Sequence, residues 1–187
     1  MPGPTKIMVI RHAEKPAESG PPHGINVNGD KDSESLIIKG WQRAGALACF
    51  FAPSYGPLQN PELAKPQFLY ASGIGHHSHS ERPQETITPL SAKLSLKINT
   101  QYLKEDHKLM VESALECDGC VLICWEHKDI PSIANQILGN TTTSPQKWPG
   151  DRFDIVWVFN WDSALSTYTF NQVPQCLLGG DSSTVIV

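Results

Sequence analysis

Ile7-Met8-Val9-Ile10-Arg11-His12 is a run of four apolar residues that ends abruptly in an arginine and a histidine. A short continuous apolar run is typical of a strand that is buried on both faces of a mainly parallel sheet. Arginine and histidine are costly to bury beside such a strand unless they are paired or used. Open α/β sheets bind ligands at the carboxyl ends of their strands. The stretch therefore predicts an anion site at Arg11 and His12, with a solvated pair at the sheet edge as the alternative.

The same pattern, an apolar strand followed by polar residues, occurs twice more along the chain. Gln67–Ala71 leads into a polar loop that ends at Arg82, and Val121–Trp125 leads directly into Glu126-His127. If these strands lie parallel to the first one, the three tips share an edge and bring two guanidiniums and two imidazoles together. Guanidiniums present forked donors that fit a tetrahedral oxyanion. A neutral imidazole nitrogen suits nucleophilic attack on phosphorus, and a second imidazole suits hydrogen bonding to a phosphoryl oxygen.

Helical periodicity alternates with these strands. Helices are predicted at residues 39–51, 83–94, 105–115 and 129–138. A short strand is expected at 97–99, and late strands at 154–159 and 166–170 are expected to pair antiparallel across a short gap. The alternation predicts a layered α/β fold with a mostly parallel sheet, in one domain over residues 1–187 with a weakly patterned tail after Pro174.

Charge and cysteine content limit the classes of partner and compartment. The chain has 15 Lys and Arg against 19 Asp and Glu, a formal net charge of -4, which argues against nucleic-acid or membrane-surface partners. There is no apolar run long enough to span a membrane, and the first residues lack the apolar segment of a signal peptide. Five cysteines, an odd number, suggest reduced thiols. A cytoplasmic location is therefore expected.

Two further groups of residues have both a functional and a structural interpretation. Cys117 and Cys120 have the spacing of a redox or zinc motif, but they run into an apolar strand, which favours a structural role. His76, His77 and His79 crowd the loop before Arg82 and have the composition of a metal-binding tract. No carboxylate or cysteine partner is fixed nearby in the sequence. A solvated loop that faces the substrate is therefore the favoured interpretation.

Taken together, five segments occur in an order that resembles the histidine phosphatase superfamily, which has the phosphoglycerate-mutase-like fold, and specifically its first branch. These segments are Val9–Glu14, Leu36–Ala48, Tyr70-Ala71-Ser72, Glu81-Arg82-Pro83-Gln84-Glu85-Thr86 and Val121–Gly139. The resemblance spans roughly residues 6–171. It implies a three-layer α/β/α fold with a mostly parallel central sheet.

The resemblance also implies the roles of the site residues. His12 would be the nucleophile that forms a phosphohistidine, and Arg11, Arg82 and His127 would bind the phosphoryl group. No metal or cofactor is implied. The partner would be a phosphorylated small molecule or a phosphoprotein.

The proton donor of the family is a carboxylic acid between the second arginine and the second histidine. Glu105 matches this position best, Glu126 and Asp129 are alternatives, and one subgroup of the family has no such acid. That subgroup acts on substrates with good leaving groups, such as phosphohistidine, whereas a monoester with a poor leaving group needs a donor.

The chain departs from the family pattern at two positions. Ala13 replaces the usual glycine after the first histidine, and Lys128 replaces the usual small residue after the second. The segments typical of phosphoglycerate mutases are not evident, which argues against mutase activity. Three functions stay open. They are a phosphatase acting on a monoester or phosphoprotein, a phosphohistidine-protein phosphatase without a general acid, and a non-catalytic module that binds a phosphorylated ligand.

Overall fold

A six-stranded sheet forms the centre of the molecule in the computed structural model, which describes residues 3–187. The strands are β1 (Lys6–Arg11), β2 (Phe68–Ala71), β3 (Ile98–Asn99), β4 (Cys120–Trp125), β5 (Ile155–Asp162) and β6 (Thr167–Pro174). They lie in the order β3-β2-β4-β1-β5-β6. Strand β5 pairs antiparallel with both β1 and β6, while the pairs β1–β4, β4–β2 and β2–β3 are parallel. The prediction of a mostly parallel sheet with a late antiparallel pair is confirmed.

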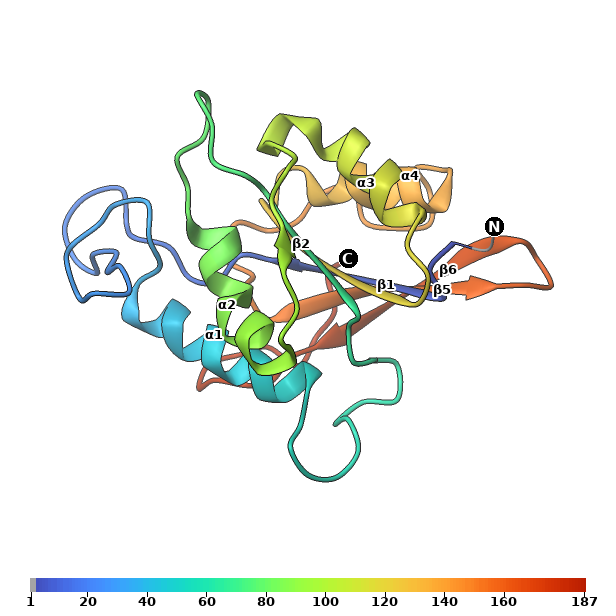
Figure 1. Ribbon diagram of the computed structural model, residues 1–187, viewed down its shortest axis with the longest axis horizontal. Coiled ribbons are helices and arrows are strands. Elements are labelled where there is room, and N and C mark those ends of the chain that lie inside the picture. Colours follow the sequence, from blue (N-terminus) through green and yellow to red (C-terminus); the bar gives the residue numbers. More distant parts are fainter. Residues whose placement is uncertain (1–2) are drawn as a thin grey trace.

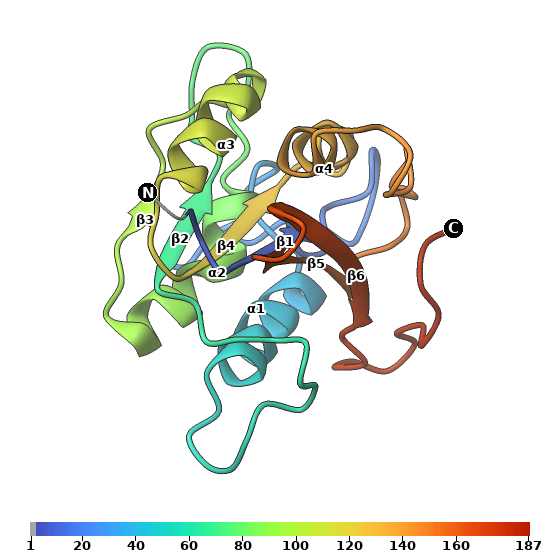
Figure 2. The same ribbon diagram turned by 90° about the vertical axis from the view of Figure 1, so that its right-hand side faces the viewer.

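Helices cover both faces of this sheet. They are α1 (Ile38–Phe51), α2 (Arg82–Leu94), α3 (His107–Leu115) and α4 (Ile130–Leu138). Helices α1 and α2 lie on one face and α3 and α4 on the other, so that the sheet is the middle of three layers (Figure 2). The predicted helix at 105–115 begins two residues later, because Lys104–Asp106 forms a 3₁₀ turn in front of α3.

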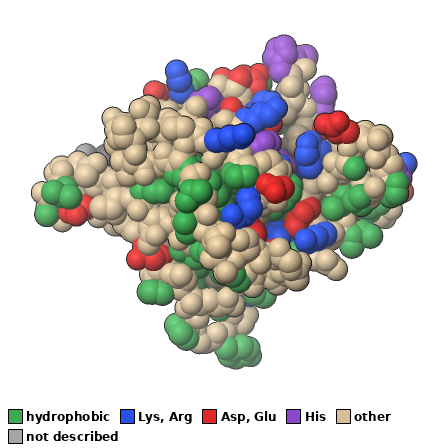
Figure 3. Space-filling view, turned by 180° about the vertical axis from the view of Figure 1, so that it is seen from behind, with side chains coloured by type: hydrophobic (Ala, Val, Ile, Leu, Met, Phe, Trp, Pro, Cys, Tyr) green, Lys and Arg blue, Asp and Glu red, His purple; other side chains and the backbone are tan. Residues whose placement is uncertain are grey.

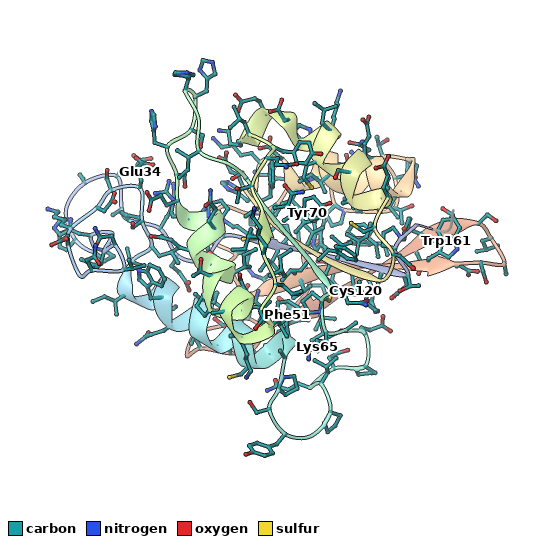
Figure 4. All side chains as sticks on the ribbon, in the orientation of Figure 1. Glu34, Phe51, Lys65, Tyr70, Cys120 and Trp161 are labelled. Atoms are coloured by element: carbon teal, nitrogen blue, oxygen red, sulfur yellow. The ribbon has the colours of Figure 1, made fainter. Side chains whose placement is uncertain are left out.

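The apolar run of β1 packs on both of these layers. Ile7 and Val9 join the core beneath α3 and α4, whereas Met8 and Ile10 join the core above α1 and α2. Figure 4 shows the same division further along the chain, with Tyr70 on the α3 side of the sheet and Phe51 on the α1 side. Burying each large apolar side chain contributes about 1.5–3 kcal/mol. This two-sided burial accounts for the purely apolar stretch of β1 between Lys6 and Arg11.

The ends of three neighbouring strands lie level at one edge of the sheet. Arg11 is opposite Trp125, and Ala71 is opposite Cys124. The backbone N–H of His12 extends the pairing by donating to the carbonyl of Trp125 at 3.1 Å. Figure 1 shows the loop after β2 projecting beyond this same edge. The three polar segments predicted from the sequence therefore emerge side by side.

The C-terminal segment, residues 175–187, packs against the domain through specific contacts. Arg43 of α1 is buried and binds the carboxylates of Glu14 and Asp181, with closest distances of 2.8 and 2.7 Å. Burial alone raises the pKa of Asp181, but its hydrogen bonds with Arg43 and with backbone amides outweigh that effect and lower the pKa to about 2. Ile186 is buried in the core beside α4 and β6. The tail that is weakly patterned in sequence is thus a fixed part of the fold.

All five cysteines are free thiols. Burial raises the pKa of Cys120 to about 12, which is the opposite of what a redox thiol requires. In residues 3–187 no helix combines the length and the apolar character needed to cross a membrane.

Candidate active site

A cavity of about 340 Å³ opens where β1, β4 and β2 end. It is lined by Arg11, His12, Lys15, Glu34, Ser72, His77, Ser78, His79, Ser80, Arg82, Pro83, Lys104, Glu126 and His127. Figure 3 shows histidines at the tip of the projecting loop on this side of the molecule, with Lys and Arg side chains below them. The structure brings four of the predicted residues, Arg11, His12, Arg82 and His127, to one cavity.

His12 is buried at the closed end of the cavity with one ring nitrogen already engaged. Its Nδ1 lies 2.8 Å from the carbonyl of Ala13, an acceptor that fixes the proton on Nδ1. Nε2 therefore keeps its lone pair. Burial is the main cause that lowers the pKa of His12 to about 3, and the charges of Arg11 and Arg82 lower it further. The ring is neutral and has the tautomer that nucleophilic attack through Nε2 requires.

Arg11 is held on one side and free on the other. Its Nη1 donates to the carbonyls of Gly150 at 2.7 Å and Arg152 at 3.1 Å, and the ring of Phe153 lies 3.8 Å from the guanidinium carbon. Its Nε and Nη2 are buried and have no partner among the described residues. Burial lowers the pKa of Arg11 to about 10, so the group is still a cation at neutral pH. Buried donors without partners are rare, and here they supply two N–H groups for an oxyanion.

Arg82 is the first residue of α2, and its side chain lines the cavity. Its Nη1 donates to the carbonyl of Ser33 at 2.9 Å, and its buried Nε has no partner among residues 3–187. The hydroxyl of Thr86 accepts from the backbone N–H of Ala13 at 2.8 Å and donates to the carbonyl of Arg82 at 2.7 Å. One side chain thus ties the backbone after the candidate nucleophile to the first turn of the helix that carries Arg82.

His127 completes the group from the tip of β4. Its Nδ1 is buried without a described partner. Burial first, and the charge of Arg11 second, lower the pKa of His127 to about 4, so that the ring is neutral near neutral pH. A neutral ring has one N–H to donate to an oxyanion.

The three candidate proton donors differ in whether they line the cavity. Glu105 is exposed in the 3₁₀ turn and does not line the cavity, and Asp129 does not line it either. Glu126 lines it and lies 2.9 Å from the Nζ of Lys104. Burial raises the pKa of Glu126, but the hydrogen bond and charge of Lys104 outweigh this effect and lower it overall. Glu126 is therefore ionised at neutral pH.

Several lining residues were not predicted from the sequence. Glu34 comes from the long loop before α1 and lies close to the loop between β2 and α2 (Figure 4). Lys104 comes from the 3₁₀ turn, and Ser78 from the histidine loop. Polar residues in irregular segments carry no periodic signal, so only the adjacency of Lys104 to Glu105 hinted at this region. In residues 3–187 no three His, Cys, Asp or Glu side chains gather as a metal site.

Solved structures show which fold this is. The protein histidine phosphatase SixA complexed with tungstate is 12% identical, with a TM-score of 0.53 and coverage of 91% of this chain and 97% of that chain. A mutant phosphoserine phosphatase from Entamoeba histolytica in complex with phosphoserine is 12% identical, with a TM-score of 0.51 and coverage of 89% and 94%. The alpha-ribazole phosphatase from Shigella flexneri is 11% identical, with a TM-score of 0.55 and coverage of 95% and 100%.

No protein-family model and no curated protein matches the sequence. The structural likeness establishes that the chain has the phosphoglycerate-mutase-like α/β fold of the histidine phosphatase superfamily, as predicted.

Proposed function

We propose that the protein is a phosphatase that hydrolyses a phosphorylated substrate through a phosphohistidine on His12. One observation carries this proposal. Unpartnered buried nitrogens of Arg11, Arg82 and His127 belong to the same cavity as the neutral ring of His12. A dianionic phosphoryl group matches these donors in charge and in hydrogen-bonding capacity.

In the first step, Nε2 of His12 attacks phosphorus as the bond from phosphorus to the leaving group breaks. A P–N bond forms, and the leaving group departs with the bonding electron pair and takes up a proton. Arg11, Arg82 and His127 stabilise the charge on the three non-bridging oxygens, which is the main catalytic contribution in phosphoryl transfer. In the second step, water attacks phosphorus, the P–N bond breaks, and inorganic phosphate leaves.

The identity of the leaving group follows from the available proton donors. Of the carboxylates that the sequence suggests as donors, only Glu126 lines the cavity, and its ion pair with Lys104 keeps it ionised. This pair favours a substrate that leaves without strong acid assistance. A phosphohistidine-protein phosphatase is therefore the second candidate function, whereas a monoester with a poor leaving group requires Glu126 to be protonated in the complex.

Rapid-quench labelling tests the central step. With a ³²P-labelled substrate, the native protein is expected to form acid-labile, base-stable phosphoprotein, and His12→Ala is expected to form none and to lose turnover of p-nitrophenyl phosphate. His23→Ala is a matched control, because His23 is exposed and lies outside this cavity. Turnover that survives in His12→Ala contradicts the mechanism. Tight phosphate binding by the native protein without any labelling favours the non-catalytic binding module.

A further inference from the structure

The orientation of Arg11 depends on a segment without regular secondary structure. The two carbonyls that accept from its Nη1 belong to Gly150 and Arg152, and the ring that stacks on it belongs to Phe153. These residues lie in the connection between α4 and β5, outside any helix or strand. Two fixed acceptors and one ring face define the plane of the guanidinium. Whatever fixes this connection therefore also decides where Nε and Nη2 point.

Arg152 fixes the connection through its side chain while its backbone carbonyl holds Arg11. Its Nε donates to Oδ1 of Asp154 at 2.7 Å, and its Nη2 donates to the carbonyl of Thr184 at 2.7 Å. The same Arg152 carbonyl that receives Arg11 also accepts from the indole N–H of Trp148 at 2.9 Å. A guanidinium that bridges two partners in a forked geometry holds them more rigidly than a lysine does.

The C-terminal segment supplies the other half of this brace. The buried carboxylate of Asp154 accepts from Arg152 on Oδ1 and from the backbone N–H of Ser182 on Oδ2, the latter at 2.6 Å. Its backbone carbonyl accepts from the N–H of Gln175 at 2.7 Å. Ile186, buried in the core, anchors the end of the segment. Asp154 therefore joins the tail, the start of β5 and the connection that holds Arg11.

We infer that Arg152 and Asp154 are positioning residues, through which the C-terminal segment sets the orientation of Arg11 and hence the oxyanion affinity of the cavity. The inference rests on the proposed role of Arg11 in binding the phosphoryl group. Neither residue lines the cavity, and the hydrogen bonds that link their segment to it end on Nη1 of Arg11. A small misplacement of a positioning contact is enough to cost a large factor in rate, because catalysis requires aligned groups.

A double-mutant cycle on phosphate binding tests this role, with affinity measured by calorimetry using inorganic phosphate and, in parallel, tungstate. Arg152→Met removes the brace but keeps the carbonyl that receives Arg11, and it is expected to weaken oxyanion binding about tenfold. In the Arg11→Lys variant, the same substitution is expected to have almost no further effect on affinity, because the guanidinium that Arg152 positions is already absent. Arg152→Lys, which keeps the charge and one contact, is expected to restore part of the affinity.

A matched control separates positioning from general loosening. Asn135 and Gln146 form a reciprocal pair that braces the preceding part of the same connection, at 2.8 and 3.0 Å, without touching Arg11. Asn135→Ala is expected to lower the melting temperature about as much as Arg152→Met does. Unlike Arg152→Met, it is expected to leave the dissociation constant for phosphate unchanged. If Arg152→Met does not fold, Asp154→Asn tests the same route, because an amide has one acceptor oxygen and cannot accept from both Arg152 and the N–H of Ser182.

The outcomes distinguish the two proposals. Native protein that binds neither phosphate nor tungstate contradicts the proposed function itself. Native binding that Arg152→Met or Asp154→Asn leaves within about twofold overturns the positioning role. Equal losses in the presence and absence of Arg11 also overturn it, since they show that the brace acts by a route other than Arg11.

Discussion

The two ends of the cavity are built in different ways. At the closed end, Arg11 is the last residue of β1, His12 follows it, and His127 comes just after β4. Backbone pairing with Trp125 sets the position of Arg11 and His12. At the open end, Lys15 and Glu34 come from a long loop, and both are exposed or partly exposed. Under the proposed function, the sheet therefore specifies how a phosphoryl group is bound, whereas the loops specify which group is attached to it. This division predicts large effects of substitutions at the closed end and small ones at the open end.

The largest expected effect is that of Arg11→Lys. Lysine cannot keep the contacts with Gly150 and Arg152 and also present two N–H groups, so kcat/KM for p-nitrophenyl phosphate should fall about 10²–10³-fold. Lys15→Met at the open end should lower it by less than about threefold, because an exposed charge contributes little. Steady-state kinetics of the two variants measures the contrast. Equal losses would remove the distinction between the two ends.

The closed end should also be the acid-sensitive part of the fold. The pKa of His12 is about 3 in the folded state and about 6.5 for an unperturbed histidine, so the unfolded chain binds more protons between these values. The contribution of His12 to stability is full above pH 6.5 and falls by about 1.4 kcal/mol per pH unit as the pH drops toward 3. Urea denaturation from pH 7 to 4 measures this slope. His12→Asn should reduce it by about 1.4 kcal/mol per pH unit and leave the contribution of His127, whose pKa is also lowered, and an unchanged slope would contradict the neutral state of the His12 ring.

Thr86→Val is expected to act next most strongly, because it breaks the contact that links the two sides of the closed end. It leaves the buried N–H of Ala13 without an acceptor, at a cost of about 1–3 kcal/mol in the free energy of unfolding. Thr88→Val is the matched control, since Thr88 also donates to a carbonyl of the preceding turn, that of Gln84, but is exposed. Its cost should stay within about 0.5 kcal/mol. Chemical denaturation compares the two, and similar costs would show that the Thr86 contact has no special role.

The smallest effect is expected from Glu126→Gln, which removes the ion pair with Lys104. Because Glu126 is ion-paired and ionised, its loss should change turnover of a phosphohistidine protein by less than about threefold. An alkyl phosphate gives the contrasting measurement, since a required general acid contributes about 10²–10⁴-fold. A loss of that size on the alkyl ester would identify Glu126 as the donor and disfavour the phosphohistidine substrate.

The same division explains how far the sequence alone could be interpreted. The strand tips at Arg11, His12 and His127 were predictable. A charged residue that ends a buried apolar strand must lie at the edge of the sheet, where it can be solvated or bind a ligand. The helices between the strands were predictable from their periodicity to within a few residues. Both features depend on patterns of neighbouring residues, which can be recognised in one sequence without the fold.

The contacts that could not be predicted are those between segments far apart in the chain. Nothing around Asp181 indicates that it meets Arg43, which lies 138 residues away. The pairing of Lys104 with Glu126 depends on how a 3₁₀ turn packs beside the tip of β4. Glu105 matched by position along the chain, but the turn that contains it directs its side chain to solvent. Irregular segments take their shape from the surfaces that they cover, and those surfaces form only in the folded chain.

The loop between β2 and α2 is pinned at both ends. The N–H of Gly73 donates to the carbonyl of Tyr102 at 2.7 Å, and that of Glu81 donates to the carbonyl of Glu34 at 3.2 Å. A Cβ on Gly73 would lie 2.4 Å from the carbonyl oxygen of Thr100, so the first anchor admits no side chain. Between these anchors, His77, Ser78, His79 and Ser80 line the cavity, and among the described residues none of them is hydrogen-bonded to Arg11, His12 or His127. In the proposed phosphatase, substitutions within residues 76–80 are therefore expected to change substrate preference and leave the phosphoryl-binding groups in place, whereas a Cβ on Gly75 would lie 2.8 Å from the side chain of Leu103.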